Sequence, residues 1–183
     1  MTRNLSSLAL VVMIFCACSA MQTKWETLSE GGMTVQMPGT PQKQTQSVET
    51  PVGPVTFNTY TTQSGNEAFI VGYNDFPDSP ATRNADPEQL LNKARDGALQ
   101  NVNGKVTSEK PLTMNGHPGK EFSGDGTSPE ADSSGKRQEA TFTARVFWVP
   151  PRLYQVLYVR PKTTSAPSEN GQKFLDSFQL TGK

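Results

Sequence analysis

The sequence predicts an α+β protein, a mainly antiparallel β-sheet flanked by helices. Segments with strand periodicity come in runs, with one helical segment between the runs and another near the end of the chain. That order is typical of the α+β class rather than of alternating parallel units. The 15 glycines and 14 prolines also favour many short strands over long helices.

The first strands follow from alternation and turn residues. Met33, Val35 and Met37 alternate with polar residues and predict a half-buried strand that ends at Pro38. Residues 43–62 predict two strands joined by a turn at Pro51–Pro54, the first polar enough to lie at a sheet edge.

The next segment, residues 67–76, predicts a central strand covered on both faces. Phe69, Val71 and Tyr73 face one way, and Ile70 faces the other.

A helix over residues 87–102 has clear end signals. Asp86 can cap it, Pro87 suits the first helical position, and Gln89 stands at the third position of a capping box. Its apolar stripe recurs at three- and four-residue spacing through Leu91, Ala94, Ala98 and Val102.

The second half predicts a hairpin, two long strands and a final helix. An Asn115–Gly116 turn joins residues 105–114 to 119–125, and residues 124–135 form a polar loop. The strand 140–148 alternates cleanly, and the strand 153–161 is apolar on both faces. A terminal helix carries Phe174, Leu175 and Phe178, which we expect to cover the strand face of Phe142, Val146 and Trp148.

Both cysteines of the chain lie in the stretch "FCACSA", residues 15–20. Arg3, the apolar run 8–15 and the small residues after it form the pattern of a secretory signal. The run is too short to span a bilayer, which needs about 20 apolar residues.

Processing before Cys18 would make the chain a lipoprotein. Cys18 follows the small residue Ala17, as in lipoprotein signals, whereas Cys16 follows the bulky Phe15. The departure from the pattern is Phe15 itself, three residues before Cys18, where an aliphatic residue is preferred. The alternative is ordinary cleavage after Ala20.

The lipoprotein interpretation sets the expected domains and location. Residues 1–17 are a signal peptide, 18–24 a tether and 25–183 a single domain. The protein is then secreted across the inner membrane and anchored on its periplasmic side through acyl chains on Cys18, with the outer membrane as the expected location. Two or more acyl chains are enough for stable anchoring.

Composition argues against several functions. The 17 basic and 17 acidic residues balance, without the clustered Lys and Arg that nucleic acid requires. His117 is the only histidine, so a zinc site of ordinary type and a His-based triad lack parts. No cofactor motif is present, and we expect no cofactor and no metal.

Two sets of acidic residues remain as candidates. Asp125, Glu130 and Asp132 could offer oxygen ligands to calcium, but the EF-hand spacing is absent, which favours a solvated loop. A carboxylate pair for hydrolysis could come from Asp75, Asp78 and Glu121. Exposed aromatics such as Phe147, Tyr154 and Tyr158 could instead line a binding face, or a second covered sheet face could explain them.

Several motifs together resemble bacterial lipoproteins of the PsbP-like superfamily. They are Trp25, "GGMTVQMPGTP", "TPVGPV", "NGHPGKEF", "RVFWVPPRLYQVLYV" and the terminal "FLDSFQL". The resemblance implies an antiparallel sheet between helices, an α/β/α sandwich, and an assembly or accessory role without known catalysis. No metal ligand of the superfamily can be placed on residues of this chain.

Two functional hypotheses follow. The first is a non-catalytic envelope module, tethered by lipid, that binds an envelope protein or a small ligand. The second is a hydrolase of the cell envelope that works from loop carboxylates. Two inward carboxylates in one cleft would favour the hydrolase, whereas a shallow surface would favour binding.

Overall fold

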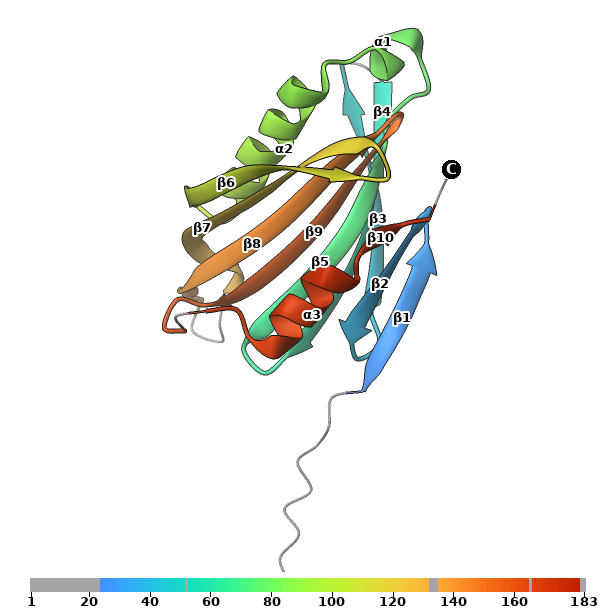
Figure 1. Ribbon diagram of the computed structural model, residues 1–183. Coiled ribbons are helices and arrows are strands. Elements are labelled where there is room, and N and C mark those ends of the chain that lie inside the picture. The colour runs from blue at the N-terminus through green and yellow to red at the C-terminus, as the bar shows by residue number, and fades with distance from the viewer. Residues whose placement is uncertain (1–23, 52, 132–134, 165, 182–183) are drawn as a thin grey trace, which may run out of the picture.

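The computed structural model describes residues 24–51, 53–131, 135–164 and 166–181 (Figure 1). The strands are β1 (Trp25–Glu30), β2 (Met33–Pro38), β3 (Gln42–Thr50), β4 (Gly53–Ser64), β5 (Glu67–Asp75), β6 (Lys105–Met114), β7 (His117–Ala131), β8 (Arg137–Val149), β9 (Arg152–Pro161) and β10 (Gln179–Leu180). The helices are α1 (Pro80–Arg83), α2 (Pro87–Asn101) and α3 (Glu169–Ser177).

The strands form two antiparallel sheets. The large sheet has seven strands in the order β3-β4-β5-β9-β8-β7-β6, and the small sheet has the order β1-β2-β10. The predicted α+β class is confirmed, with β3 at an edge and β5 between β4 and β9 as the sequence predicts. No helix within the described part of the chain is long and apolar enough to cross a membrane.

The large sheet lies between two layers (Figure 1). Helix α2 covers one face, where Leu91 packs in a cluster with Phe142 and Trp148. Helix α3 and the small sheet cover the other face, where Phe174 packs with Phe69. The layered arrangement therefore agrees with an α/β/α sandwich, with the small sheet added to one outer layer.

The predicted cover for strand β8 is wrong. The side chains of Phe142, Val146 and Trp148 face α2, not the terminal helix. Alternation along β8 places Phe147 on the opposite face, where its ring stacks on Phe178 at 5.6 Å between centroids. A period of two identifies the residues that share a face, but it does not identify the layer that covers them.

Strand β1 was not predicted. It pairs with β2 from Trp25↔Pro38 to Glu30↔Met33. Trp25 and Leu28 are its apolar side chains, and both are only partly buried. Their spacing of three lacks the alternation of a strand, so the pairing depends on β2 rather than on a local pattern.

The composition predicted a polar loop over residues 124–135. Residues 124–131 instead form the second half of β7. They continue the ladder with β8 through Gly126↔Ala140 and Thr127↔Glu139, and the register shifts between Thr127 and Ala131. A β-carbon at Gly126 would collide with the carbonyl oxygen of Val102. Glycine here permits a close approach of two chain segments rather than a turn.

Helix α2 begins as predicted. The carboxylate of Asp86 accepts a hydrogen bond from the main-chain nitrogen of Glu88 at 2.9 Å, and Pro87 occupies the first turn. The cap satisfies one of the free N–H groups at the helix start. Helix α2 thus begins where its apolar stripe can reach the large sheet.

Candidate binding site

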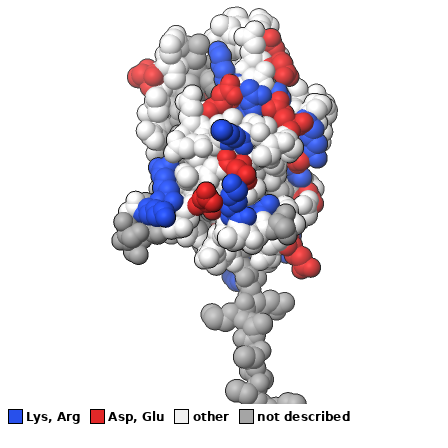
Figure 2. Space-filling view, turned by 90° about the vertical axis from the view of Figure 1, so that its left-hand side faces the viewer, with Lys and Arg blue, Asp and Glu red and all other residues white. Residues whose placement is uncertain are grey.

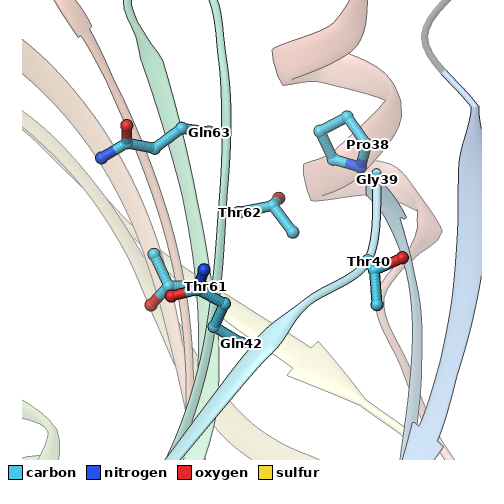
Figure 3. Close-up of a pocket in the computed structure, with 7 residues that line it drawn as sticks. All are labelled: Pro38, Gly39, Thr40, Gln42, Thr61, Thr62 and Gln63. Atoms are coloured by element: carbon cyan, nitrogen blue, oxygen red, sulfur yellow. The ribbon is translucent and has the colours of Figure 1, made fainter.

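A pocket of about 410 Å³ lies where the chain passes from the small sheet to the edge of the large one (Figure 3). We call it the β4 pocket. Its lining residues come from the β2–β3 connection, the start of β3 and the end of β4, and they are Pro38, Gly39, Thr40, Gln42, Thr61, Thr62 and Gln63.

The local chain path creates this pocket. Strand β2 ends at Pro38, and Gly39 takes a φ of +85°, in the left-handed region that favours glycine. Strand β3 then pairs with β4 only from Gln42↔Thr61 onward. The last residues of β4, 62–64, therefore have a partner strand on the β5 side alone.

Thr62 is the most informative residue of the β4 pocket. It is 7% exposed, and its side chain points from β4 toward residues 38–40 (Figure 3). Its hydroxyl has no hydrogen-bond partner in the described part of the chain. A buried polar group left unpaired costs about 1–3 kcal/mol, so a ligand that bonded this hydroxyl would recover part of that cost.

The chemistry of the β4 pocket is neutral. Its side-chain polar groups are the amides of Gln42 and Gln63 and the hydroxyls of three threonines. Such groups donate and accept hydrogen bonds but do not act as acids or bases near neutral pH. The β4 pocket is therefore suited to holding amide or hydroxyl groups rather than to breaking bonds.

Sequence reasoning missed the β4 pocket. The run after Pro41 indicated only a polar edge strand. Tyr60 and Thr62 lie on one face of β4, but the unpaired state of Thr62 depends on where β3 begins. That register is a tertiary property with no local signal.

A second pocket, of about 230 Å³, lies beside the cis peptide bond between Pro150 and Pro151. Its charged groups already bind one another. The Arg152 guanidinium donates to the Asp75 carboxylate at 2.5 Å and lies 4.4 Å from the ring centre of Tyr73. These contacts give Arg152 and Asp75 a structural role.

The carboxylates predicted for hydrolysis each pair with a cation. Asp75 binds Arg152, Asp78 binds Arg83, and Glu121 binds Lys110 and Arg145. Two strands, β9 and β8, lie between Asp75 on β5 and Glu121 on β7. That arrangement separates them by about 14 Å across the sheet, whereas paired carboxylates of glycosidases lie about 5–9.5 Å apart.

The ionisation of two of these carboxylates also argues against acid catalysis. The hydrogen bond from Arg83 holds the pKa of Asp78 below its usual value. Burial raises the pKa of Glu121, but hydrogen bonds from Lys110 and Arg145 outweigh it and leave that pKa lowered. A general acid needs a raised pKa, so neither residue suits that role.

The expected calcium ligands can be checked only in part. Asp125 lies on β7, where it accepts a hydrogen bond from Thr141 at 3.1 Å and pairs with Lys162 at 3.4 Å. Asp132 and the side chain of Glu130 lie outside what the structure describes. No group of three or more potential metal ligands occurs among the described residues.

His117 and the three aromatic candidates have structural positions. His117 opens β7, is half-buried and pairs with Met114 across the hairpin. The idea of exposed aromatics is wrong, because Phe147, Tyr154 and Tyr158 are at most 4% exposed. They belong to the core beneath α3 and the small sheet.

The lipidation residue Cys18, the signal peptide 1–17 and all of the tether except Lys24 lie outside the described residues. On the face shown in Figure 2, basic and acidic side chains alternate rather than gather by sign. Among the ion pairs of the structure, the buried Lys120 binds both Glu88 and Glu109, at 2.9 and 2.8 Å. This face therefore offers no single-signed patch.

The comparisons with known proteins found similarity in the fold and not in the sequence. No protein-family model matches the chain, and a search of curated proteins returns no match. The chain is similar to the solution structure of cyanobacterial PsbP (CyanoP) from Synechocystis sp. PCC 6803, with a TM-score of 0.52 and 11% sequence identity. That alignment covers 91% of this chain and 98% of the other. The predicted PsbP-like fold is thus confirmed.

A crystal structure of a protein of unknown function from Pseudomonas aeruginosa aligns at a TM-score of 0.34 and 8% identity. The alignment covers 75% of this chain and 83% of that one.

Proposed function

We propose that this chain is a lipid-anchored protein of the bacterial envelope that acts as a non-catalytic binding or accessory module. The anchor is Cys18, which follows Ala17 after a short apolar run. The PsbP-like fold and the lipoprotein pattern of the leader together support this assignment. Its partner is an envelope protein or small ligand that presents neutral amide or hydroxyl groups.

The observation that carries the proposal is the buried, unpaired hydroxyl of Thr62 in the neutral β4 pocket. A binding site can keep a polar group that the fold leaves unsatisfied, because the ligand supplies the missing hydrogen bond. Main-chain groups along residues 62–64, which lack a partner strand on the pocket side, offer further hydrogen bonds. Neither feature requires a reactive side chain.

The test places a photo-activated cross-linking residue at Thr40, which is exposed at the rim of the β4 pocket, in the full chain. The matched control places it at Gln89, an exposed residue of α2 on another part of the surface. We expect a discrete adduct from Thr40 and not from Gln89, identified by mass spectrometry as a protein or a small molecule. Identical adducts from both positions would contradict the proposal.

A second variant, Thr62→Val, separates binding from stability. Valine has nearly the same shape and removes the unpaired hydroxyl, so the fold should be at least as stable as before. Loss of one hydrogen bond to the ligand should weaken the adduct roughly three- to tenfold. An unchanged adduct in a folded Thr62→Val protein would show that this hydroxyl is not used.

A further inference from the structure

Strand β3 leaves one edge of the large sheet open. It pairs with β4 on one side, and its side chains from Gln42 to Glu49 are all exposed. An edge strand of this kind presents a row of main-chain N–H and C=O groups that can pair with another strand. At nine residues, β3 is long enough to support a stable ladder.

The opposite edge, β6, is protected in the usual ways. Pro111 lacks an N–H group, Lys105 and Lys110 place charges along the edge, and the register with β7 shifts between Val106 and Ser108. Each of these features discourages pairing with a further strand. By contrast, the strand "QKQTQSVET" has no proline and carries only two charges, Lys43 and Glu49.

The spacing of these two charges fits antiparallel pairing with a second copy of β3. In an antiparallel ladder, the main-chain groups of two directly opposite residues either both point toward the partner strand or both point away from it, so two identical strands pair residues of the same parity. Centring the pair on Gln46 places Lys43, which also binds the Glu30 carboxylate of its own chain, opposite Glu49 of the second copy. Two-fold symmetry forms this pair twice.

The neighbouring registers lose the charge match. Centring on Thr45 would place Lys43 opposite Ser47, and centring on Ser47 would place Glu49 opposite Thr45. In a parallel pair in register, Lys43 would lie beside Lys43 of the second copy and Glu49 beside Glu49. Opposite charges across a ladder are favourable and like charges are unfavourable.

We propose that two copies of this chain associate through β3, antiparallel and centred on Gln46, so that their large sheets join into one. The charged pair then lies on the sheet face of Tyr60, since Lys43 lies 5.4 Å from the centre of that ring. This inference goes beyond the proposed binding function. It uses none of the residues that the β4 pocket needs except Gln42, at the end of the interface.

Cysteine scanning of the full chain in its own envelope tests the register. Thr45, Gln46 and Ser47 are each replaced by cysteine, all at exposed positions, and the envelope is oxidised before a non-reducing gel. We expect a disulfide-linked dimer from Gln46→Cys at several-fold higher yield than from the other two. A maximum at position 45 or 47, or similar low yields at all three, would overturn the proposal.

Charge variants in the Gln46→Cys background provide an independent test. Lys43→Glu makes both charged positions acidic and Glu49→Lys makes both basic, so each variant alone should give a dimer yield roughly two- to thirtyfold lower. Co-expressed with different tags, the two variants should cross-link to each other at a higher yield than either gives alone, although Lys43→Glu also removes the ion pair of Lys43 with Glu30. Glu139→Lys, an exposed change on β8, is the matched control and should have no effect. Equal yields in all pairings would overturn the proposed register.

Discussion

Gly171 of α3 lies directly against the ring of Tyr158 on β9, so close that a β-carbon at Gly171 would overlap the ring. The Tyr158 hydroxyl in turn donates a hydrogen bond to the Glu67 carboxylate and lies 3.2 Å from the Ser168 hydroxyl. Ser168 caps α3 by accepting from the Gly171 nitrogen at 3.0 Å. The missing side chain therefore allows α3 to pack on the large sheet.

We expect Gly171→Ala to destabilise the protein by about 1–3 kcal/mol, because overpacking outweighs the gain in helix propensity. Gly97→Ala is the matched control, since Gly97 is exposed in the middle of α2 and a β-carbon there meets nothing within 4 Å. That change should stabilise the protein by about 0.5–1 kcal/mol. Urea unfolding of both variants measures the two effects, and effects of the same sign would contradict this packing.

Arg145 links strand β8 to helix α3. Its side chain is 17% exposed and donates to the Glu121 carboxylate at 2.6 Å and to the main-chain oxygen of Leu175 at 2.6 Å. Arg145→Met should therefore destabilise the protein by about 2–4 kcal/mol, since it leaves half-buried acceptors without their donor.

The matched control for Arg145 is Arg83→Met. The Arg83–Asp78 pair is also formed through an arginine, but both side chains are more than half exposed. Exposed pairs contribute little to stability, so this variant should unfold at the urea concentration of the unchanged protein. If both variants unfolded at that concentration, Arg145 would have no structural role.

Strand β8 provides a third comparison, between the neighbours Phe142 and Thr143. Phe142 is 3% exposed and packs edge-on against Phe122 beneath α2. Phe142→Ala should cost about 3–5 kcal/mol of unfolding free energy. Thr143 is half-buried on the opposite face, with its hydroxyl 3.0 Å from that of Ser123, and Thr143→Ala should cost under about 1 kcal/mol. Equal, small losses in urea unfolding would contradict the burial of Phe142.

The sequence could predict those elements whose signals are local. Alternation identified β2, β5 and β8, and the polar run from residue 43 identified the edge strand β3. Asp86 and Pro87 located the start of α2. These features follow from side-chain period and capping, which depend on a few adjacent residues.

The features that the sequence did not predict depend on distant partners. Strand β1 forms on β2, and β7 continues past Gly124 because it is paired with β8. The assignment of the Phe142 face to α2 depends on how the helices pack. The β4 pocket likewise depends on where β3 begins its pairing with β4, so the unpaired Thr62 could not be recognised from the chain alone.

The most direct test of the account is whether Cys18 carries the membrane anchor. The full chain, Cys18→Ala and Cys16→Ala are each expressed in a bacterial host and partitioned between detergent and aqueous phases, and the N-terminal peptide is examined by mass spectrometry. Because Ala17 precedes Cys18 and the bulky Phe15 precedes Cys16, we expect Cys18→Ala to move to the aqueous phase and Cys16→Ala to stay in the detergent phase. A Cys18→Ala protein that still partitions into detergent would contradict the account.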